Sequence, residues 1–164
     1  MGGGAIQDAV THLGDLMAWF LGPASLVSAQ AGHLVLPGVT VEDTVHLFSR
    51  HPQALASLSL NQFQAANELT ITLNTPDSQI RIESHLQRFG SCTRPEGKWE
   101  WHAVPAVERD TPFINQANAF LDAAEGLREP LCSFEAGMDA LRFQLAILAS
   151  QRESHRGINP ADIN

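Results

Sequence analysis

The sequence predicts an α+β fold, a largely antiparallel, open-faced sheet of about six strands with helices packed on one face. Apolar residues recur at helical spacing near both ends of the 164-residue chain, and they alternate with polar residues through the middle. Short links join the alternating segments, which is typical of antiparallel pairing because parallel strands need long crossovers. We expect residues 1–164 to form one domain, with the sheet at 24–104 and helices at 5–21, 112–128 and 133–153.

The first predicted helix follows a run of glycines and ends before Gly22-Pro23, a pair that stops helices. Its packing stripe is predicted to consist of Ile6, Leu13, Met17 and Phe20. Near the other end of the chain, Thr111-Pro112 is typical of a helix start and Ser133 of a helix cap. The last helix carries an apolar stripe formed by Phe134, Met138, Leu141, Leu145 and Leu148.

Six segments alternate well enough to be predicted as strands: 24–36, 42–51, 54–63, 68–74, 79–86 and 98–104. Residues 89–97 are predicted to form a loop. One sheet face is expected to be buried, and the other to carry Ser57, Ser59, Thr70, Thr72, Arg81, Glu83 and Glu100. This polar face could meet water or a second copy of the chain, and we predict that it forms a dimer or larger homo-oligomer.

Composition excludes several classes of function. The net charge of −8 argues against a nucleic-acid surface, which needs clustered Lys and Arg. No apolar run reaches the roughly 18 residues of a membrane helix, and no basic segment of a signal peptide precedes residue 5. Cys92 and Cys132 have no CxxC partner, which favours reduced thiols and a cytoplasmic location.

Three polar residues share one stripe of the first predicted helix, Asp8, His12 and Asp15. A carboxylate one turn from an imidazole can orient the ring while the ring exchanges a proton with a substrate. The same spacing could hold a metal ion, or His12 could be a structural residue on a helix surface. From the spacing alone, all three interpretations remain open.

The opening pattern Gly-Gly-Gly-x-x-x-Asp8-x-x-x-His12-x-x-Asp15 resembles the C-terminal domain of the Gfo/Idh/MocA (glucose–fructose oxidoreductase/inositol dehydrogenase) family. The resemblance continues through Val41-Glu42-Asp43-Thr44 and the strands up to Glu83. It closes with the segment from Phe113 to Leu121 and with the final helix, whose end matches over Ser150 to Gly157. It therefore covers almost the whole chain.

This resemblance implies the substrate-binding and oligomerisation domain of an NAD(P)-dependent oxidoreductase that acts on a sugar, cyclitol or related polyol. It implies that Asp8 and His12 are the active-site pair, with His12 exchanging the proton. Thr11 and Asp15 are implied as substrate-binding or supporting residues, and Gly3 and Gly4 as the turn near the nicotinamide. No metal is expected.

Two features of the family are missing from the sequence. No G-x-G-x-x-G follows a strand, and the family's Glu-Lys-Pro segment is absent, because the only lysine is Lys98 in a predicted strand. We therefore expect that an N-terminal Rossmann domain supplies the NAD or NADP site, and that this chain alone binds no cofactor and is inactive. The alternative is a non-catalytic binding, assembly or regulatory module derived from the same family.

Overall fold

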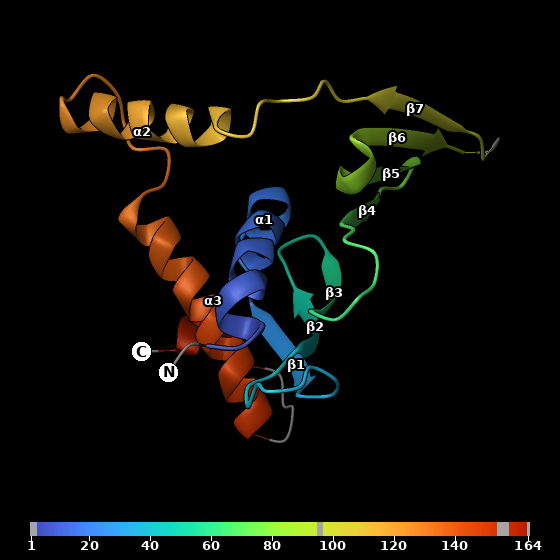
Figure 1. Cartoon of the computed structure of the whole chain (residues 1–164), viewed down its shortest axis with the longest axis vertical. Helices are drawn as coiled ribbons and strands as arrows, with labels where there is room; N and C mark the ends of the chain where they lie inside the picture. The colour runs from blue at the N-terminus through green and yellow to red at the C-terminus, as the bar shows by residue number, and fades with distance from the viewer. Residues whose placement is uncertain (1–2, 95–96, 154–157, 164) are drawn as a thin grey trace. The chain divides into compact units, whose positions relative to one another are not determined.

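The computed structural model describes residues 3–94, 97–153 and 158–163 (Figure 1). It confirms the α+β class and the antiparallel pairing of the strands. The chain divides into two compact units, Met1–Phe63 with Leu131–Asn164, and Gln64–Pro130. A single domain stays a prediction, and the units are described separately. Gly2 and residues 154–157, which belong to the family-like segments, lie outside the described residues.

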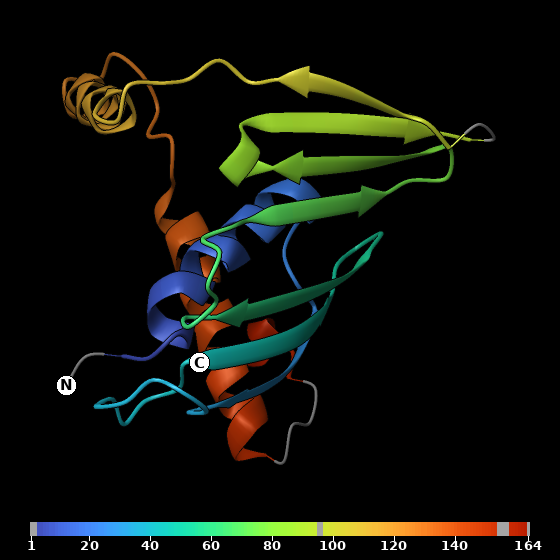
Figure 2. The same ribbon diagram turned by 45° about the vertical axis from the view of Figure 1, so that its right-hand side comes forward.

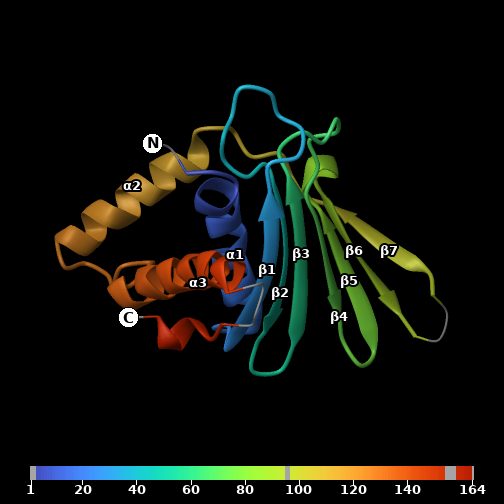
Figure 3. The same cartoon turned by 90° about the horizontal axis from the view of Figure 1, so that it is seen from below.

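The first unit is a three-stranded antiparallel sheet, in the order β1-β2-β3, with α1 and α3 on one face (Figure 3). Its elements are the π-helix η1 (Ile6–Val10), α1 (Thr11–Leu21), β1 (Leu26–Gly32), β2 (Thr44–Arg50), β3 (Leu55–Asn61), α3 (Phe134–Arg152) and the 3-10 turn η3 (Pro160–Asp162). Ser133 caps α3 as expected, because its hydroxyl accepts a hydrogen bond from the Ala136 N–H at 3.1 Å.

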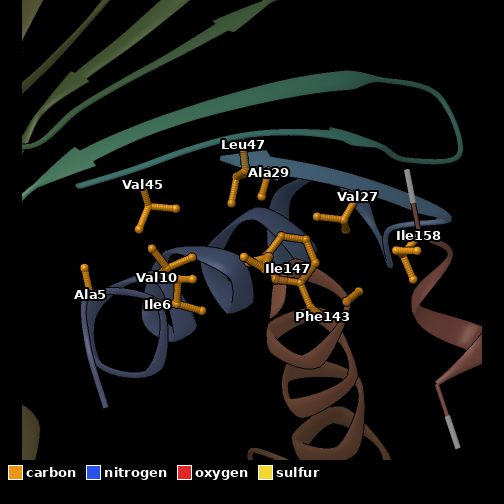
Figure 4. Close-up of a cluster of buried hydrophobic side chains, with 11 residues drawn as sticks. Ala5, Ile6, Val10, Val27, Ala29, Val45, Leu47, Phe143, Ile147 and Ile158 are labelled. Carbon is orange, nitrogen blue, oxygen red and sulfur yellow. The ribbon is translucent and has the colours of Figure 1, made fainter. Parts of the chain in front are cut away.

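The core of this unit lies between the sheet and the two helices (Figure 4). Its buried apolar residues are Ala5, Ile6, Val10, Val27, Ala29, Val45, Leu47, Phe143, Ala146, Ile147 and Ile158. The edge of β1 is covered as well. The Ala29 N–H donates to the buried Ser150 hydroxyl of α3, and Val27 pairs through its backbone with Ile158. Residues of the C-terminal part of the chain thus cover the outer edge of β1 at Val27 and Ala29.

The buried stripe of the first helix differs from the predicted one. Ile6, Val10 and Gly14 are buried, whereas Leu13 is only half-buried. The reason is the π turn, which closes hydrogen bonds from residue i to i+5 and so shifts every later residue around the helix. The strand predicted at 24–36 also ends early, at Gly32. Beyond it, the Leu34 N–H donates to the Asp43 carboxylate instead of pairing with β2.

The second unit holds a four-stranded antiparallel meander, in the order β4-β5-β6-β7 (Figure 2). Its elements are β4 (Thr70–Asn74), β5 (Ser78–Glu83), the 3-10 turn η2 (Ser84–Leu86), β6 (Arg88–Thr93), β7 (Trp99–Ala103) and α2 (Thr111–Ala124). On one face of this meander, Arg81 stacks over Trp99 at 4.9 Å from the ring centroid, and Arg88 over Trp101 at 4.1 Å.

Three details of the predicted sheet are corrected. The strands form two hydrogen-bonded sheets instead of one, because no strand forms in residues 62–69. The loop predicted at 89–97 is largely β6, which was missed because small and polar residues occupy both of its faces. Glu100 lies on the face of Ile80, opposite Arg81, because the pairing of β5, β6 and β7 aligns Arg81 with Trp101.

None of the described helices is both long and apolar enough to cross a membrane.

Candidate functional site

A cleft of about 700 Å³ lies between α1 and the N-terminal half of α3, within the first unit. From α1 it is lined by His12, Asp15 and the largely exposed Trp19. A mostly apolar cleft with a few convergent polar groups is the usual form of a small-molecule site. The polar residues of the cleft are therefore the candidates for function.

The two helices approach closely beside the cleft. A Cβ on the buried Gly14 would lie 2.6 Å from ring atoms of Phe143, so only glycine lets α1 and α3 come this near. Both residues line the cleft. Gly14 therefore sets the spacing of the helices that present the candidate residues.

His51 lines the cleft from β2's side and is itself buried. Its Nδ1–H donates to the Gly22 carbonyl at 2.7 Å, and its Nε2 accepts from the Ser49 hydroxyl at 3.0 Å. Gly22 ends α1, with its N–H donating to the Ala18 carbonyl. His51 thus ties the end of α1 to the sheet and holds one side of the cleft in place.

The α3 wall of the cleft carries both charges of an ion pair. Arg142 Nη1 lies 3.1 Å from Asp139 Oδ1, and both side chains are about half exposed. Such a pair contributes little to stability but leaves hydrogen-bonding groups at the surface of the cleft. These groups can meet hydroxyls of a polar ligand.

The structure brings together some of the predicted site residues. His12 and Asp15 are exposed and line the cleft. Asp8 is exposed on the π turn and is not among the residues that line it. Thr11 faces α3, where its hydroxyl accepts from Gln144 Nε2 at 2.6 Å.

The predicted glycine turn lies against a side chain of the same chain. Gly4 is buried, and a Cβ there would lie 2.4 Å from the Glu42 carboxylate carbon. The Glu42 carbonyl accepts from the Ala5 N–H, and its Oε1 accepts from the Ile6 N–H. Gly3 is exposed, and a Cβ there would overlap the side chain of Gln7. The space beside both glycines is thus already filled.

Asp43, the next residue of the Val41–Thr44 motif, is a fully buried carboxylate with four hydrogen-bond donors. Burial raises the pKa of this carboxyl, but hydrogen bonds from the backbone N–H groups of Leu36, Val35 and Leu34, with the Thr44 hydroxyl, outweigh it. The net result is a pKa well below the ordinary value of 3.8. Asp43 therefore stays charged and fixes the loop between β1 and β2.

Sequence reasoning missed His51, Asp139 and Arg142. A residue directly before a proline, as His51 is, is typical of a turn and does not by itself indicate a site. Asp139 and Arg142 lie three residues apart and outside the apolar stripe of their helix, which is a usable signal for a charged pair on one helix face. Nothing in the spacing shows that this face turns toward α1.

The residues that the structure describes contain no group of three or more His, Cys, Asp or Glu side chains able to hold a metal ion. Asp8, His12 and Asp15 do not converge in this way.

Three solved structures of oxidoreductases resemble this chain in fold. An oxidoreductase from Agrobacterium radiobacter, in complex with NAD+, L-tartaric acid and magnesium, matches with a TM-score of 0.82 and 15% identity over 97% of this chain and 50% of its own. The WlbA dehydrogenase from Bordetella pertussis, in complex with NADH and UDP-GlcNAcA, matches with a TM-score of 0.72 and 22% identity. The match covers 96% of this chain and 45% of WlbA. UDP-N-acetylglucosamine 3-dehydrogenase GnnA from Acidithiobacillus ferrooxidans matches with a TM-score of 0.71 and 19% identity. The match covers 89% of this chain and 46% of GnnA.

The fold is an α+β domain that these solved proteins also contain, and the chain spans about half of their length. The family model "GFO/IDH/MocA C-terminal domain" matches residues 1–85. The chain belongs to this family, as the Asp8–His12 motif predicts. No curated protein sequence matches closely enough to count as a relative.

Proposed function

We propose that this chain is the substrate-binding and oligomerisation domain of an NAD(P)-dependent oxidoreductase that acts on a sugar, cyclitol or related polyol. The observation that carries the proposal is the position of His12. In a chain of this family, it lies on α1 where it lines the cleft, with the Asp15 carboxylate beside it in the lining.

His12 is the group proposed to exchange a proton with a substrate hydroxyl or carbonyl. Its ring is exposed and so can reach a ligand, which a general acid or base must do. Asp8 precedes it by four residues and is proposed to orient the ring or to bind a substrate hydroxyl. Asp15, with Asp139 and Arg142 from the opposite wall, offers further hydrogen bonds to a polyol.

The described residues do not fit a dinucleotide. A pyrophosphate is usually held where a glycine-rich turn leaves room at the start of a helix, with a strand before it. Here Glu42 and Gln7 fill the space beside Gly4 and Gly3. We therefore assign NAD(P) binding, and with it hydride transfer, to a Rossmann domain of a longer protein, and we propose that this chain alone is inactive.

The outer face of the first sheet is proposed as the oligomer interface. The register places two rows of side chains across the three strands on the face opposite the helices, Ser28-Phe48-Ser57 and Gln30-His46-Ser59. Phe48 is 41% exposed there, and the same residues line a shallow groove. Short side chains around one exposed aromatic ring can pack against a second copy.

Light scattering at micromolar concentration tests this interface. We expect a dimer or larger species for the wild type, and dissociation for Phe48→Asp, because the new carboxylate would be buried without a partner. Phe134→Asp, at another exposed phenylalanine, is the control and is expected to leave the assembly intact. A wild-type chain that is only monomeric contradicts the interface.

The catalytic part is tested by His12→Ala in the complete oxidoreductase. Loss of proton transfer is expected to lower kcat by roughly 10²–10⁴-fold while KM changes much less. His85→Ala, in the second unit, is the matched histidine control. Turnover that His12→Ala leaves unchanged contradicts the proposal. A complete protein that binds the polyol but never turns it over would instead identify the non-catalytic module.

The cytoplasmic location rests on the two free thiols and is also a proposal.

A further inference from the structure

The helix that carries Asp8 and His12 begins with an uncommon turn. In η1, the Val10 N–H donates to the Ala5 carbonyl five residues back, at 3.0 Å, instead of to the carbonyl four residues back. Single π turns of this kind are rare, because ordinary α-helical hydrogen bonding is more favourable, and they are frequent at functional sites. Some specific contact must therefore hold this turn.

Apolar burial supplies part of that support. Ala5, Ile6 and Val10 are all fully buried, and the side chains of Ile6 and Val10 belong to the core below the sheet (Figure 4). Burial fixes which residues of the turn face inward. It does not by itself satisfy the carbonyl groups of the widened turn, which need hydrogen-bond donors.

A side chain from the far end of the chain supplies these donors. Gln144 of α3 donates from Nε2 to the Thr11 hydroxyl at 2.6 Å and lies 3.5 Å from the Ile6 carbonyl. The Thr11 hydroxyl in turn lies 3.3 Å from the Ile6 carbonyl and 3.2 Å from the Gln7 carbonyl. Gln144 and Thr11 thus form a chain of hydrogen bonds that reaches two successive carbonyls of the π turn.

This turn determines how Asp8 stands relative to His12. In a continuous α-helix, residues four apart are rotated by about 40° around the axis. A π turn advances less per residue, because its hydrogen bonds span one residue more. Four residues that cross it come closer to one full turn, so Asp8 and His12 stand nearly in line along the helix.

We propose that Gln144 is a positioning residue that acts through Thr11 to hold the π turn and so aligns Asp8 with His12. The role of the aligned pair rests on the proposed function, whereas the hold on the turn does not. Gln144 does not line the cleft, so its effect on a reaction would pass through the helix start.

The first test uses the 164-residue chain and NMR. Gln144→Leu and the isosteric Gln144→Glu, which both remove the amide donor, are expected to speed hydrogen exchange at the Val10 N–H by about tenfold or more. Thr11→Val should act like them and add little in a double variant, whereas Thr11→Ser should behave as wild type. Gln151→Leu is the control, because the buried Gln151 amide nitrogen on the same helix makes no hydrogen bond to any residue that the structure describes. Unchanged exchange and chemical shifts across residues 6–10 in both Gln144 variants would overturn the proposal.

The second test measures kinetics in the complete oxidoreductase. Gln144→Leu is expected to lower kcat by roughly 10- to 100-fold with little change in KM, because a small misplacement of the reacting groups slows the chemical step. Unchanged kcat for Gln144→Leu, with kcat still lost in His12→Ala, overturns the positioning role but keeps the proposed function. Unchanged kcat for His12→Ala contradicts the proposed function, and the NMR result then still decides whether Gln144 holds the turn.

Discussion

The two units use the same kind of antiparallel strands but stabilise them in different ways. In the first unit, α1 and α3 cover one face of the sheet, and eleven apolar side chains form a buried cluster. In the second unit, the only buried apolar residue among those described is Ala119. Its strands keep isoleucines and leucines half-buried, and large apolar side chains of α2 are exposed.

The second unit relies instead on contacts along its strands. Arg81 and Arg88 stack over Trp99 and Trp101, and Arg88 Nε lies 2.6 Å from Glu83 Oε2. Each cation–π contact is worth about 0.5–2 kcal/mol, compared with about 1.5–3 kcal/mol for one fully buried large apolar side chain. Paired strands alone therefore do not make a stable unit, and we expect the first unit to be the more stable one.

The largest effect should come from a cavity in the first unit. Ile147 is fully buried between the helices and the sheet, so Ile147→Ala is expected to lower the free energy of unfolding by about 2–5 kcal/mol. Ile82→Ala, in the half-exposed meander, should cost less than half as much. The three tryptophans make the comparison measurable. In a W99F/W101F background, the fluorescence of Trp19 reports on the unfolding of the first unit. In a W19F background, the fluorescence of Trp99 and Trp101 reports on the second unit.

Urea unfolding followed by tryptophan fluorescence gives both transitions. Equal losses for the two alanine variants would show that the second unit is as tightly packed as the first. A single transition common to both reporters would show that the units unfold together.

Alanine substitutions at two glycines of the first unit should change the free energy of unfolding by smaller amounts and in opposite directions. Gly14→Ala is expected to cost about 1–3 kcal/mol, because its methyl group would overlap the Phe143 ring. Gly137→Ala, on α3 with nothing within 4 Å, should instead gain about 0.5–1 kcal/mol from helix propensity. Thermal unfolding of both variants measures this difference. A neutral Gly14→Ala would show that the helices can move apart without cost.

The sequence was informative where one physical rule acted alone. Alternation located the strands that have one apolar face, and Ser133 marked the start of α3 because capping is local. β6 was not predicted, because apolar and polar residues do not alternate regularly along it. Only its pairing with β5 and β7 defines it as a strand. The π turn was not predicted either, because the side chain that donates hydrogen bonds to it, Gln144, is 133 residues away from Thr11 in the sequence.

The candidate site was predicted to a similar extent. The Asp8–His12 spacing located the helix and the residue that lines the cleft, because both properties lie within one turn of sequence. The opposite wall, with Asp139 and Arg142, depends on how α3 packs on α1, and the close contact of Gly14 with Phe143 is part of that packing. Residues that meet only through tertiary packing leave no mark in local spacing.

An effect that depends on pH is expected at Asp43. Its folded-state pKa lies below the ordinary value of 3.8, so its stabilising contribution is fully present above that value and is lost as the pH falls toward the folded-state pKa. The wild-type transition reported by Trp19 should therefore lose stability below about pH 4. Asp43→Asn should be less stable near neutrality, because its amide nitrogen cannot accept from the N–H groups that now share two carboxylate oxygens. It should also show a flatter dependence on pH, so that the two curves approach each other in acid. Urea unfolding between about pH 3 and pH 7 measures this, and parallel curves would mean that Asp43 is not the group whose charge holds the β1–β2 loop.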